Sequence, residues 1–471
     1  AAGPGGGACG CVLANRLTEI KSNKVLLLEA GERDDYLWIK IPVGYLYCIG
    51  NPRTDWLYKT EAQVGLNGRT LEYPRGKVLG GCSSINGMIY MRGQARDYDH
   101  WCQLGNIKWG WDDILPYFKK SEDYYLGKNE MHGEGGEWRV ENQRVNWHIL
   151  DAFKDACLQY GIPQTNDFNC GNNEGVSYFR VNQKKGIRVS TSSAFLKPVE
   201  KRSNLKVITK ATVEKILFNG KRVKGVSYNI GNESFFSESK KEIILSAGSI
   251  GTPQILQLSG IGDADFLNRR EIQVVQNLPG VGKNLQDHLQ IRCVYKVKNS
   301  STLNENINSI SGKCKMALKY LFNRSGPLSM SPSQLGVFIK SNSFLDTPDL
   351  QYHIQPLSLE RFGQPLHHFP AFTASVCNLR PQSRGEVFIT SKNPYDKPKI
   401  SPNYLSSEYD REIAAKSIKI TREIVNQPAL KPYLVEEYLP GIQYQSDKEL
   451  AIEAGNISST IFHPVGTAKM G

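Results

Sequence analysis

The sequence of 471 residues lacks several features that would assign it to a special class of protein. No window approaches the roughly 18 uninterrupted apolar residues of a membrane-spanning helix, and no signal peptide is recognisable at the start. The ten cysteines include no C-x-x-C pair, and the chain is far larger than a disulfide-stapled domain, so reduced thiols in a cytosol are expected. The histidines show no spacing typical of metal ligands, so no metal site is expected.

The chain also lacks a basic block with interleaved aromatic residues, although its formal net charge is +12. Its lysines and arginines are spread along the sequence, which indicates a solvated surface and no nucleic-acid function. Hydrophobic residues make up 40% and charged residues 22%, as is usual for a globular protein, and the length suggests two or three domains. We expect a cytoplasmic protein with at most peripheral contact with the inner membrane.

What the chain does contain begins with a glycine-rich turn near its start. Gly5, Gly7 and Gly10 stand in G-x-G-x-x-G spacing, followed by a predicted helix over residues 11–20 and a buried strand that ends at Glu29. The first glycine permits a tight turn, the second lets backbone amides approach a pyrophosphate, and the third lets helix and strand pack closely. A carboxylate at the end of the second strand can accept both ribose hydroxyls. The segment therefore predicts a site for a dinucleotide, either FAD or NAD.

The strand expected before this turn has an unusual composition. Residues 1–4 are small and include Gly3 and Pro4, and proline cannot donate to a sheet ladder. We therefore expect a first strand that is truncated or altered.

A second motif, at residues 74–101, decides between the two dinucleotides. It reads PRGKVLGGCSSINGMIYMRGQARDYDHW and resembles the flavin signature of the glucose-methanol-choline (GMC) oxidoreductase family. Small residues there would let the main chain lie against the flavin ring, which a bulky side chain would displace. Some family members carry a histidine bonded covalently to the flavin at the position of Asn86, so Asn86 implies noncovalent FAD. The resemblance implies FAD contacts from Val78, Gly81, Ser83, Asn86, Gly87, Met88 and Ile89.

Residues 248–262 resemble a second signature of the same family. The apolar run at residues 243–247 predicts a strand that enters a glycine turn, and Thr252-Pro253 is a suitable start for the following helix. The resemblance implies that Gly248 lies beside the cofactor. It also implies that Val213, in an earlier predicted strand, contacts the adenine through its backbone.

The last residues of the chain, 461–471, match the His-Pro-x-Gly-Thr-x-x-Met-Gly signature of the family. Oxidation of an alcohol by hydride transfer to a flavin requires a base for the hydroxyl proton, and the resemblance implies that His463 is that base. The other seven histidines, His288 among them, are expected to be structural or at the surface. Relatives continue into a strand and helix with a second active-site residue. We therefore expect that residue beyond Gly471, a chain incomplete at both ends, and impaired turnover.

The order of the motifs predicts an α/β (α+β) fold, in which a Rossmann-like FAD-binding domain is interleaved with a substrate domain built on an antiparallel sheet. We expect residues 1–296 to form mainly the FAD-binding domain and residues 297–460 mainly the substrate domain. Residues 461–471 are expected to return to the FAD-binding domain with the catalytic histidine. Within the substrate domain, the pattern predicts strands at residues 350–354, 372–379 and 386–390 and a helix at 410–425.

The resemblance implies an FAD-dependent alcohol dehydrogenase that oxidises a small-molecule alcohol to an aldehyde. The electron acceptor is expected to be a quinone or another carrier, and an oxidase is less favoured. Bacterial choline dehydrogenases tend to carry an acidic residue before a segment that resembles residues 336–341, and neutral Gln334 disfavours choline here. Choline dehydrogenase stays an alternative.

Three further alternatives remain open. A lyase or light-driven decarboxylase can share this scaffold, and the chain could also be an inactive fragment. An NAD-dependent enzyme is a third, but it would have no use for the motif at residues 74–101.

Overall fold

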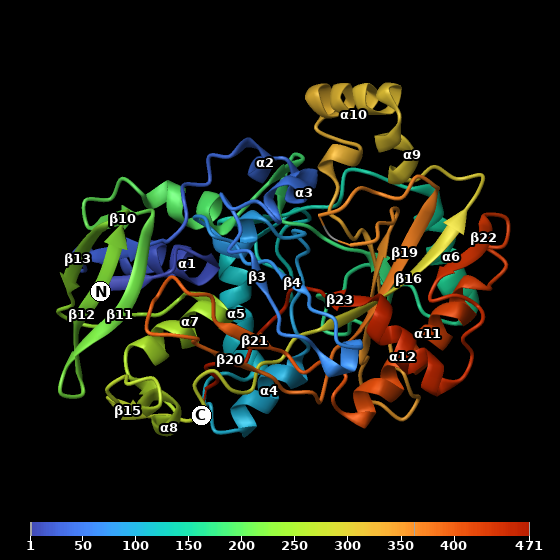
Figure 1. Cartoon of the computed structure of the whole chain (residues 1–471). Coiled ribbons are helices and arrows are strands. Elements are labelled where there is room, and N and C mark those ends of the chain that lie inside the picture. The colour runs from blue at the N-terminus through green and yellow to red at the C-terminus, as the bar shows by residue number, and fades with distance from the viewer. Residues whose placement is uncertain (1, 362, 471) are drawn as a thin grey trace.

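The computed structural model describes residues 2–361 and 363–470, so residues 1 and 471 of the terminal motifs lie outside the described residues. The chain forms two parts (Figure 1). One contains helix α1 and strands β10 to β13, and the other contains a large sheet with helices α6, α11 and α12 beside it. This architecture confirms the predicted α/β (α+β) class, with its antiparallel sheet.

A small parallel sheet carries the glycine turn. Its strands, in the order β1-β2-β10, are Ala2–Pro4, Val25–Leu28 and Leu205–Ile208. Helix α1 (Ala8–Leu17) packs on this sheet, because Cys11 and Ala14 share an apolar cluster with Leu27. The predicted strand-turn-helix-strand order is therefore present, although α1 begins and ends three residues earlier than the sequence pattern indicated.

The first strand forms with three residues, so Gly3 and Pro4 do not prevent its pairing, and its altered character stays a prediction. Residues 2–4 pair in parallel with residues 26–28. The Gly5 amide donates to Leu28 O at 2.7 Å, and amide directions alternate along a strand. The backbone nitrogen of Pro4 therefore points away from β2, so its missing donor breaks no bond between these two strands.

A second, antiparallel sheet lies beside the first. It is formed by β11 (Ala211–Asn219), β12 (Arg222–Ile230) and β13 (Glu233–Glu238). The two-residue turn at Gly220-Lys221 joins β11 to β12 as a hairpin, because Asn219 pairs with Arg222.

The region around the second GMC signature differs from the prediction in two ways. Residues 243–247 form no regular strand; Ile243 and Leu245 pack as partly buried side chains in the apolar cluster that also contains Leu28. An apolar run by itself does not distinguish a strand from another buried segment. Helix α7 (Gly248–Leu258) begins before Thr252-Pro253, so the proline lies inside the helix.

The large antiparallel sheet has the strand order β22-β16-β19-β18-β17-β7, with β23 also paired to β16. Strands β18 and β19 and helix α11 (Glu408–Val425) lie where the sequence predicts them. Strands β7 and β16 come mainly from residues before 297, so this sheet crosses the expected domain boundary, and the domain limits stay a prediction. The strands are β7 (Gly175–Tyr178), β16 (Leu289–Val297), β17 (Leu335–Ile339), β18 (Leu350–Gln355), β19 (Ala371–Asn378), β22 (Leu434–Leu439) and β23 (Ser458–Thr460).

The two faces of this sheet have different surroundings. Helices α11 and α6 (His148–Tyr160) cover one face, where the buried Tyr352 hydroxyl lies 3.1 Å from Thr421 Oγ1 of α11. Successive side chains of a strand alternate between faces. The side chains of residues 351, 353 and 355 therefore point to the opposite face, toward the first part of the molecule.

The remaining elements cover the edges of the two parts. Helices α4 (Ala95–Gln103), α5 (Trp111–Ser121) and α12 (Asp447–Ile457) are the longest of these in the body, whereas α9 (Leu303–Asn308) and α10 (Ile310–Asn323) stand out from it (Figure 1). None of the described helices combines the length and apolar character needed to traverse a lipid bilayer. The short elements are α2 (Leu37–Lys40), α3 (Tyr45–Cys48), β3 (Tyr58–Lys59), β4 (Glu72–Tyr73), β5 (Glu122–Tyr124), β6 (Trp138–Val140), β8 (Gln183–Lys184), β9 (Ile187–Arg188), β14 (Ile261–Gly262), α8 (Ala264–Asn268), β15 (Gln276–Asn277), β20 (Glu386–Phe388) and β21 (Lys399–Ser401).

Candidate functional site

The glycine turn brings three segments of backbone into close contact. Gly5 has φ +110°, and a Cβ atom there would lie 2.4 Å from Ser246 O. A Cβ atom on Gly10 would lie 1.9 Å from Gly5 O, so helix α1 can start directly on the turn only without that atom. Gly7 is different, because the nearest atom to its Cβ position is 3.8 Å away. Gly5 and Gly10 are thus required by packing, whereas Gly7 leaves space for a ligand.

Glu29 closes the turn from the end of β2. One carboxylate oxygen accepts the Gly6 amide at 2.7 Å, and the other accepts the Gly31 amide at 2.8 Å. The residue is only 5% exposed, and burial raises the pKa of its carboxyl to about 7. Each oxygen keeps a lone pair, so Glu29 can hold the turn and still accept a ligand hydroxyl.

A cavity of about 570 Å³ opens beside this turn, and we call it the glycine-turn cavity. It is bounded by the turn, by β11, by the start of α7 and by residues 464–468 of the C-terminal signature. Of the residues implied to bind FAD, its wall contains Gly5, Gly7, Glu29, Gly81, Val213 and Gly248.

A hydrogen bond joins the C-terminal signature to α7 at this wall. Inside a helix, the residue four positions after Ser249 would normally donate its amide to Ser249 O, but that residue is Pro253, which has no N–H. The hydroxyl of Thr467 donates to Ser249 O instead, at 2.6 Å. Thr467 is only 1% exposed, so this bond satisfies a carbonyl in a protected position and fixes the signature against α7.

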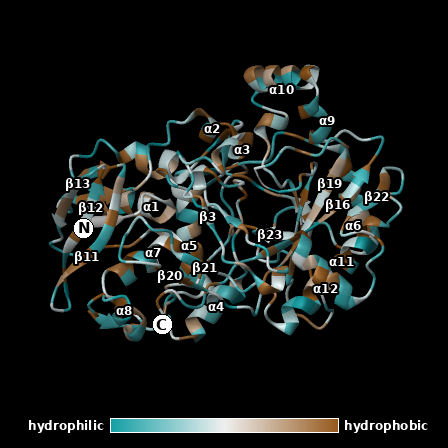
Figure 2. Ribbon diagram, in the orientation of Figure 1, coloured by the Kyte–Doolittle hydropathy of each residue, from teal (hydrophilic) through white to brown (hydrophobic). Residues whose placement is uncertain are grey.

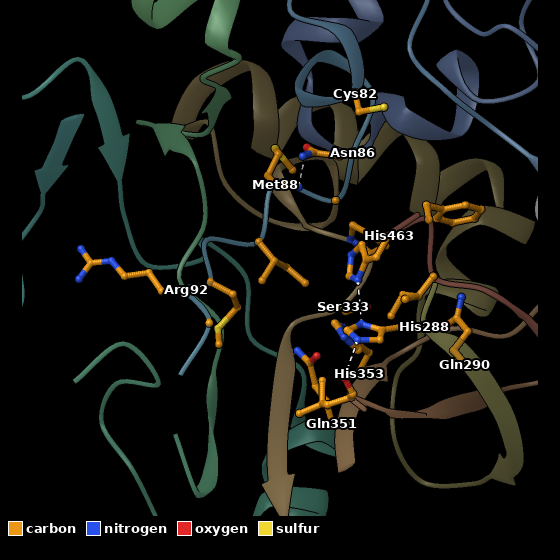
Figure 3. A pocket seen from close by; sticks show the side chains of 18 of the residues that line it. Cys82, Asn86, Met88, Arg92, His288, Gln290, Ser333, Gln351, His353 and His463 are labelled. Carbon is orange, nitrogen blue, oxygen red and sulfur yellow. Dashed lines mark hydrogen bonds between the residues drawn. The ribbon is translucent and has the colours of Figure 1, made fainter. Parts of the chain in front are cut away.

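A second cavity of about 590 Å³ lies between the glycine-turn cavity and the large sheet, and we call it the histidine cavity (Figure 3). Arg75 and Cys82 line both cavities, which therefore adjoin. Of the predicted site residues, its wall contains Asn86, Gly87, Met88, Ile89 and His463.

Asn86 is held so that one end of its side chain faces this cavity. Its amide oxygen accepts the Met88 amide and Arg188 Nη1, both at 2.9 Å. Arg188 is buried, and this burial lowers its pKa to about 10. Because both bonds use the oxygen, the nitrogen of the Asn86 side chain is the end left for a ligand (Figure 3).

Three of the predicted FAD-binding residues do not lie in the wall of either cavity. Gly10 is at the packed start of α1, and Val78 is 1% exposed in a short bridge with Glu32. The Ser83 hydroxyl donates to Gly80 O at 2.6 Å and accepts the amide of Thr191 at 2.9 Å, so it holds the loop in place. Their contacts with the cofactor stay a prediction.

The backbone of His463 is fixed by a buried carboxylate. Asp287 Oδ1 accepts the His463 amide at 2.9 Å. Its other oxygen accepts Tyr73 and Thr460 hydroxyls at 2.9 and 2.6 Å, and the Tyr404 hydroxyl as well. Asp287 therefore accepts four hydrogen bonds, two of them from residues 460–463 and two from distant segments, and so positions the histidine.

The His463 ring lies against His288 in the histidine cavity (Figure 3). The two Nδ1 atoms are 3.4 Å apart, and His288 Nε2 is 3.1 Å from Leu379 O. Although the cavity lets water reach the His463 ring, the surrounding protein, with His288, His353 and Arg75, lowers its pKa well below the usual value. Burial also lowers the pKa of His288, so both rings are neutral near pH 7.

Leu379 O, His288 and His463 form a chain of hydrogen bonds, and with both rings neutral only one arrangement of the ring protons is consistent with it. A carbonyl oxygen only accepts, so His288 carries its hydrogen on Nε2 and donates to Leu379 O. His288 Nδ1 is then an acceptor, and His463 Nδ1 must donate to it. The assignment follows from the hydrogen-bond network and leaves His463 Nε2 as a lone pair.

The sheet supplies a polar wall that the motifs did not reveal. Gln290, Ser333, Gln351 and His353 line the histidine cavity together with His288 (Figure 3). Gln355 lines it as well. Burial lowers the pKa of His353 to about 3. A sequence signal existed, because residues 351, 353 and 355 are polar at every second position of an otherwise apolar strand. Gln334, by contrast, is fully buried and does not line this cavity, so its neutrality says nothing about the ligand.

Comparison with known families and sequences gives a consistent result. Two family models, both described as GMC oxidoreductase, match residues 4–290 and 381–471. The chain is 40% identical over 469 residues to an oxygen-dependent choline dehydrogenase of Vibrio vulnificus, which covers 99% of this chain and 84% of the relative. It is 39% identical over 470 residues to an alcohol dehydrogenase [acceptor] of Pseudomonas putida, covering 99% of this chain and 85% of the relative.

Solved structures show the same fold. A pyridoxine 4-oxidase from Mesorbium loti superposes with a TM-score of 0.89 at 29% identity, covering 100% of this chain and 88% of that one. A formate oxidase of Aspergillus oryzae superposes with a TM-score of 0.92 at 25% identity, covering 99% of this chain and 88% of that one.

Proposed function

Because the chain belongs to the GMC oxidoreductase family and its cofactor is therefore FAD, we propose that it oxidises an alcohol to an aldehyde by hydride transfer to FAD, with His463 as the base. FAD supplies the hydride acceptor when it is bound. The protein contributes the base, the orientation of the alcohol and the exclusion of water from the reacting atoms.

The residues of the two adjoining cavities fit FAD bound noncovalently. The glycine-turn cavity offers the open position at Gly7 for a pyrophosphate and the remaining lone pairs of Glu29 for ribose hydroxyls. Val213 would reach the adenine from β11. The histidine cavity offers the side-chain nitrogen of Asn86, which is no nucleophile, beside the flavin ring.

The observation that carries the catalytic proposal is the proton arrangement of the two histidines. His288 accepts from His463 Nδ1, so His463 Nε2 is an acceptor within the cavity. The lowered pKa of His463 keeps it in this form at neutral pH. An alcohol whose hydroxyl reaches His463 Nε2 can transfer its proton there as the hydride leaves the carbinol carbon.

The walls of the histidine cavity favour an uncharged alcohol. Its apolar side includes Ile89, Met91 and Phe338. Among the described residues that line it, Asp97 is the one carboxylate, and it is paired with Arg380 at 2.6 Å. A quaternary ammonium group would find no unpaired anion there, so a primary or aliphatic alcohol suits the cavity better than choline.

Choline remains the second candidate because several relatives are named choline dehydrogenases. For the electron acceptor, we propose a quinone or another carrier in preference to oxygen. The name of the Pseudomonas putida relative, alcohol dehydrogenase [acceptor], supports this preference.

The test of the base is the rate of flavin reduction. His463→Ala is expected to slow anaerobic flavin reduction by a primary alcohol about 10²- to 10⁴-fold, while the visible flavin spectrum is retained. His148→Ala is the matched control, because this histidine is exposed at the start of α6. An unchanged rate in His463→Ala would exclude the catalytic assignment.

The test of the substrate class uses the wild-type holoenzyme. Uncharged primary alcohols and choline are compared with an artificial electron acceptor and with oxygen, and a higher kcat/KM is expected for the uncharged alcohols with the artificial acceptor. A preference for choline would make the second candidate correct. If no alcohol bleached the flavin under anaerobic conditions, a lyase or decarboxylase on the same scaffold would be favoured.

A further inference from the structure

Helix α10, preceded by α9, forms an arm that projects from the body of the protein (Figure 1). One face of α10 holds the arm in place: Met316 and Tyr320 are buried, and the Tyr320 hydroxyl donates to Gly186 O at 3.0 Å. Most of the remaining circumference of α10 is exposed to solvent.

The ribbon of α10 includes hydrophobic residues (Figure 2), and large apolar side chains of this helix are exposed away from the anchor. The exposed fractions of Ile310, Leu318, Leu321 and Phe322 are 84%, 55%, 64% and 77%. At about 100° per residue, these four positions fall within a sector of about 120° on the far side from the anchor. Single exposed apolar residues are ordinary, but a contiguous group indicates an interaction surface. We call these four residues the apolar face of α10.

Lysines border the apolar face on both sides. On the helical projection, Lys313 lies beyond one edge, and Lys315 and Lys319 lie beyond the other. Helix α10 contains no aspartate or glutamate. In α9, Glu305 accepts the Thr302 amide at 3.1 Å and is thereby used in the cap of that helix. The arm therefore presents an apolar stripe edged by positive charge.

We propose that the arm docks on an anionic lipid bilayer, with the apolar face of α10 among the acyl chains and its lysines at the level of the phosphates. An interfacial helix needs this combination, because the apolar stripe enters the boundary of the hydrocarbon while long lysine side chains reach back to the headgroups. The inference depends on the arm alone and not on the chemistry at His463.

A second copy of the chain is a poorer occupant of this surface. A helix of 14 residues is about 21 Å long and about 10 Å wide, so one face offers roughly 200 Å². A stable protein interface needs about 800 Å² from each partner. A bilayer has no such requirement, and its phosphates complement the lysines.

The experiment is flotation of the FAD-loaded full chain with vesicles of phosphatidylcholine, with and without phosphatidylglycerol. Wild type is expected to bind the vesicles that contain phosphatidylglycerol about tenfold more strongly than pure phosphatidylcholine, and less strongly as salt is raised. The double variant Leu321→Glu/Phe322→Glu should lose at least about tenfold of this binding. Lys315→Glu/Lys319→Glu should lose the preference for phosphatidylglycerol.

The matched control is Ile107→Glu. It places the same charge at an apolar residue that is 78% exposed in the loop between α4 and α5, and it should change vesicle binding less than about twofold. The flavin spectrum and alcohol oxidation of every variant in lipid-free buffer verify that the variants are folded, and they test the proposed function separately.

Two results would overturn the proposal. One is vesicle binding by wild type that is absent, or that is the same in the Leu321→Glu/Phe322→Glu variant. The other is a lipid-free dimer of wild type, measured by light scattering, that this double variant converts to a monomer, because the apolar face would then belong to a subunit interface.

Discussion

The hydrogen bond between Thr467 and α7 gives a prediction that joins two distant motifs. Thr467→Val removes the hydroxyl but keeps the shape of the side chain. Ser249 O then loses its 2.6 Å partner, and Pro253 has no amide to replace it. The carbonyl of Ser249, which is partly buried, would be left without a protein donor.

The expected loss of stability in Thr467→Val follows from the cost of leaving the Ser249 carbonyl without a hydrogen-bond donor. Leaving a buried carbonyl without a partner costs about 1–3 kcal/mol of unfolding free energy, and the partial burial of Ser249 places its cost toward the lower end of this range. With about 2.1 cal/mol/K per residue, a chain of 471 residues that unfolds as one unit has an unfolding entropy of about 1 kcal/mol/K. The melting temperature should therefore fall by about 1–3 °C. FAD should also bind less tightly, because Thr467 and Ser249 both line the glycine-turn cavity.

A double-mutant cycle distinguishes this mechanism from general damage. Pro253→Ala supplies an amide that can donate to Ser249 O within the helix. In the Pro253→Ala background, Thr467→Val should lower the unfolding free energy by less than in wild type. The coupling energy between the two substitutions should be about 1–2 kcal/mol. Any effect of Pro253→Ala on the unfolded chain is common to both arms of the cycle and cancels.

The assay is urea unfolding of all four proteins with FAD in excess, followed by flavin and tryptophan fluorescence. FAD dissociation constants from flavin titration provide an independent readout. The reasoning fails if Thr467→Val lowers the unfolding free energy equally with Pro253 and with alanine at that position. The hydrogen bond to Ser249 O would then not account for the contribution of Thr467 to stability.

Three further predictions concern single residues. Burial lowers the pKa of His353 from about 6.5 to about 3, so between these values the unfolded chain binds a proton that the folded chain does not, and stability falls as pH falls below about 6.5. Urea unfolding of His353→Phe at pH 5 and pH 7.5 should therefore show a pH difference smaller by about 2 kcal/mol than in wild type; an identical difference would show that His353 titrates normally. The lowered pKa of His463 keeps the base neutral in mild acid, so kcat/KM for an alcohol should change less than about twofold from pH 7.5 to pH 6. A fall with a midpoint near 6.5 would contradict the described environment of that ring. Gly10→Ala places a methyl 1.9 Å from Gly5 O, and it should destabilise the protein by at least about 1–3 kcal/mol and weaken FAD binding, as measured by thermal unfolding and flavin titration; normal FAD affinity would mean that the turn can move.

The histidine cavity shows why part of the site was not accessible from motifs. His463 and Asn86 stand in segments whose residue types and spacing are distinctive over many positions. His288, Gln290 and His353 have no such spacing, because they come together only when β16 and β18 lie in one sheet. Their polar alternation was visible, but alternation does not say which face of a strand meets a cavity.

The second GMC signature shows a different limit. An apolar run followed by glycine and Thr-Pro predicts a strand and then a helix that starts at the proline. The helix begins earlier, and the hydroxyl of Thr467, more than two hundred residues away in the sequence, donates to the carbonyl that Pro253 leaves without a helical donor. A local pattern contains no information about such a distant partner.

The sequence by itself determined the family, the cofactor, the glycine turn and the histidine of the C-terminal signature, because these depend on short runs of residues whose chemistry is local. The tertiary structure decided how the proton of His463 is placed, which side chains form the polar wall, and that the arm leaves an apolar face uncovered. Each of these depends on distances between residues far apart in the chain. Such distances are fixed by the pairing of strands and the packing of helices, and not by the local pattern.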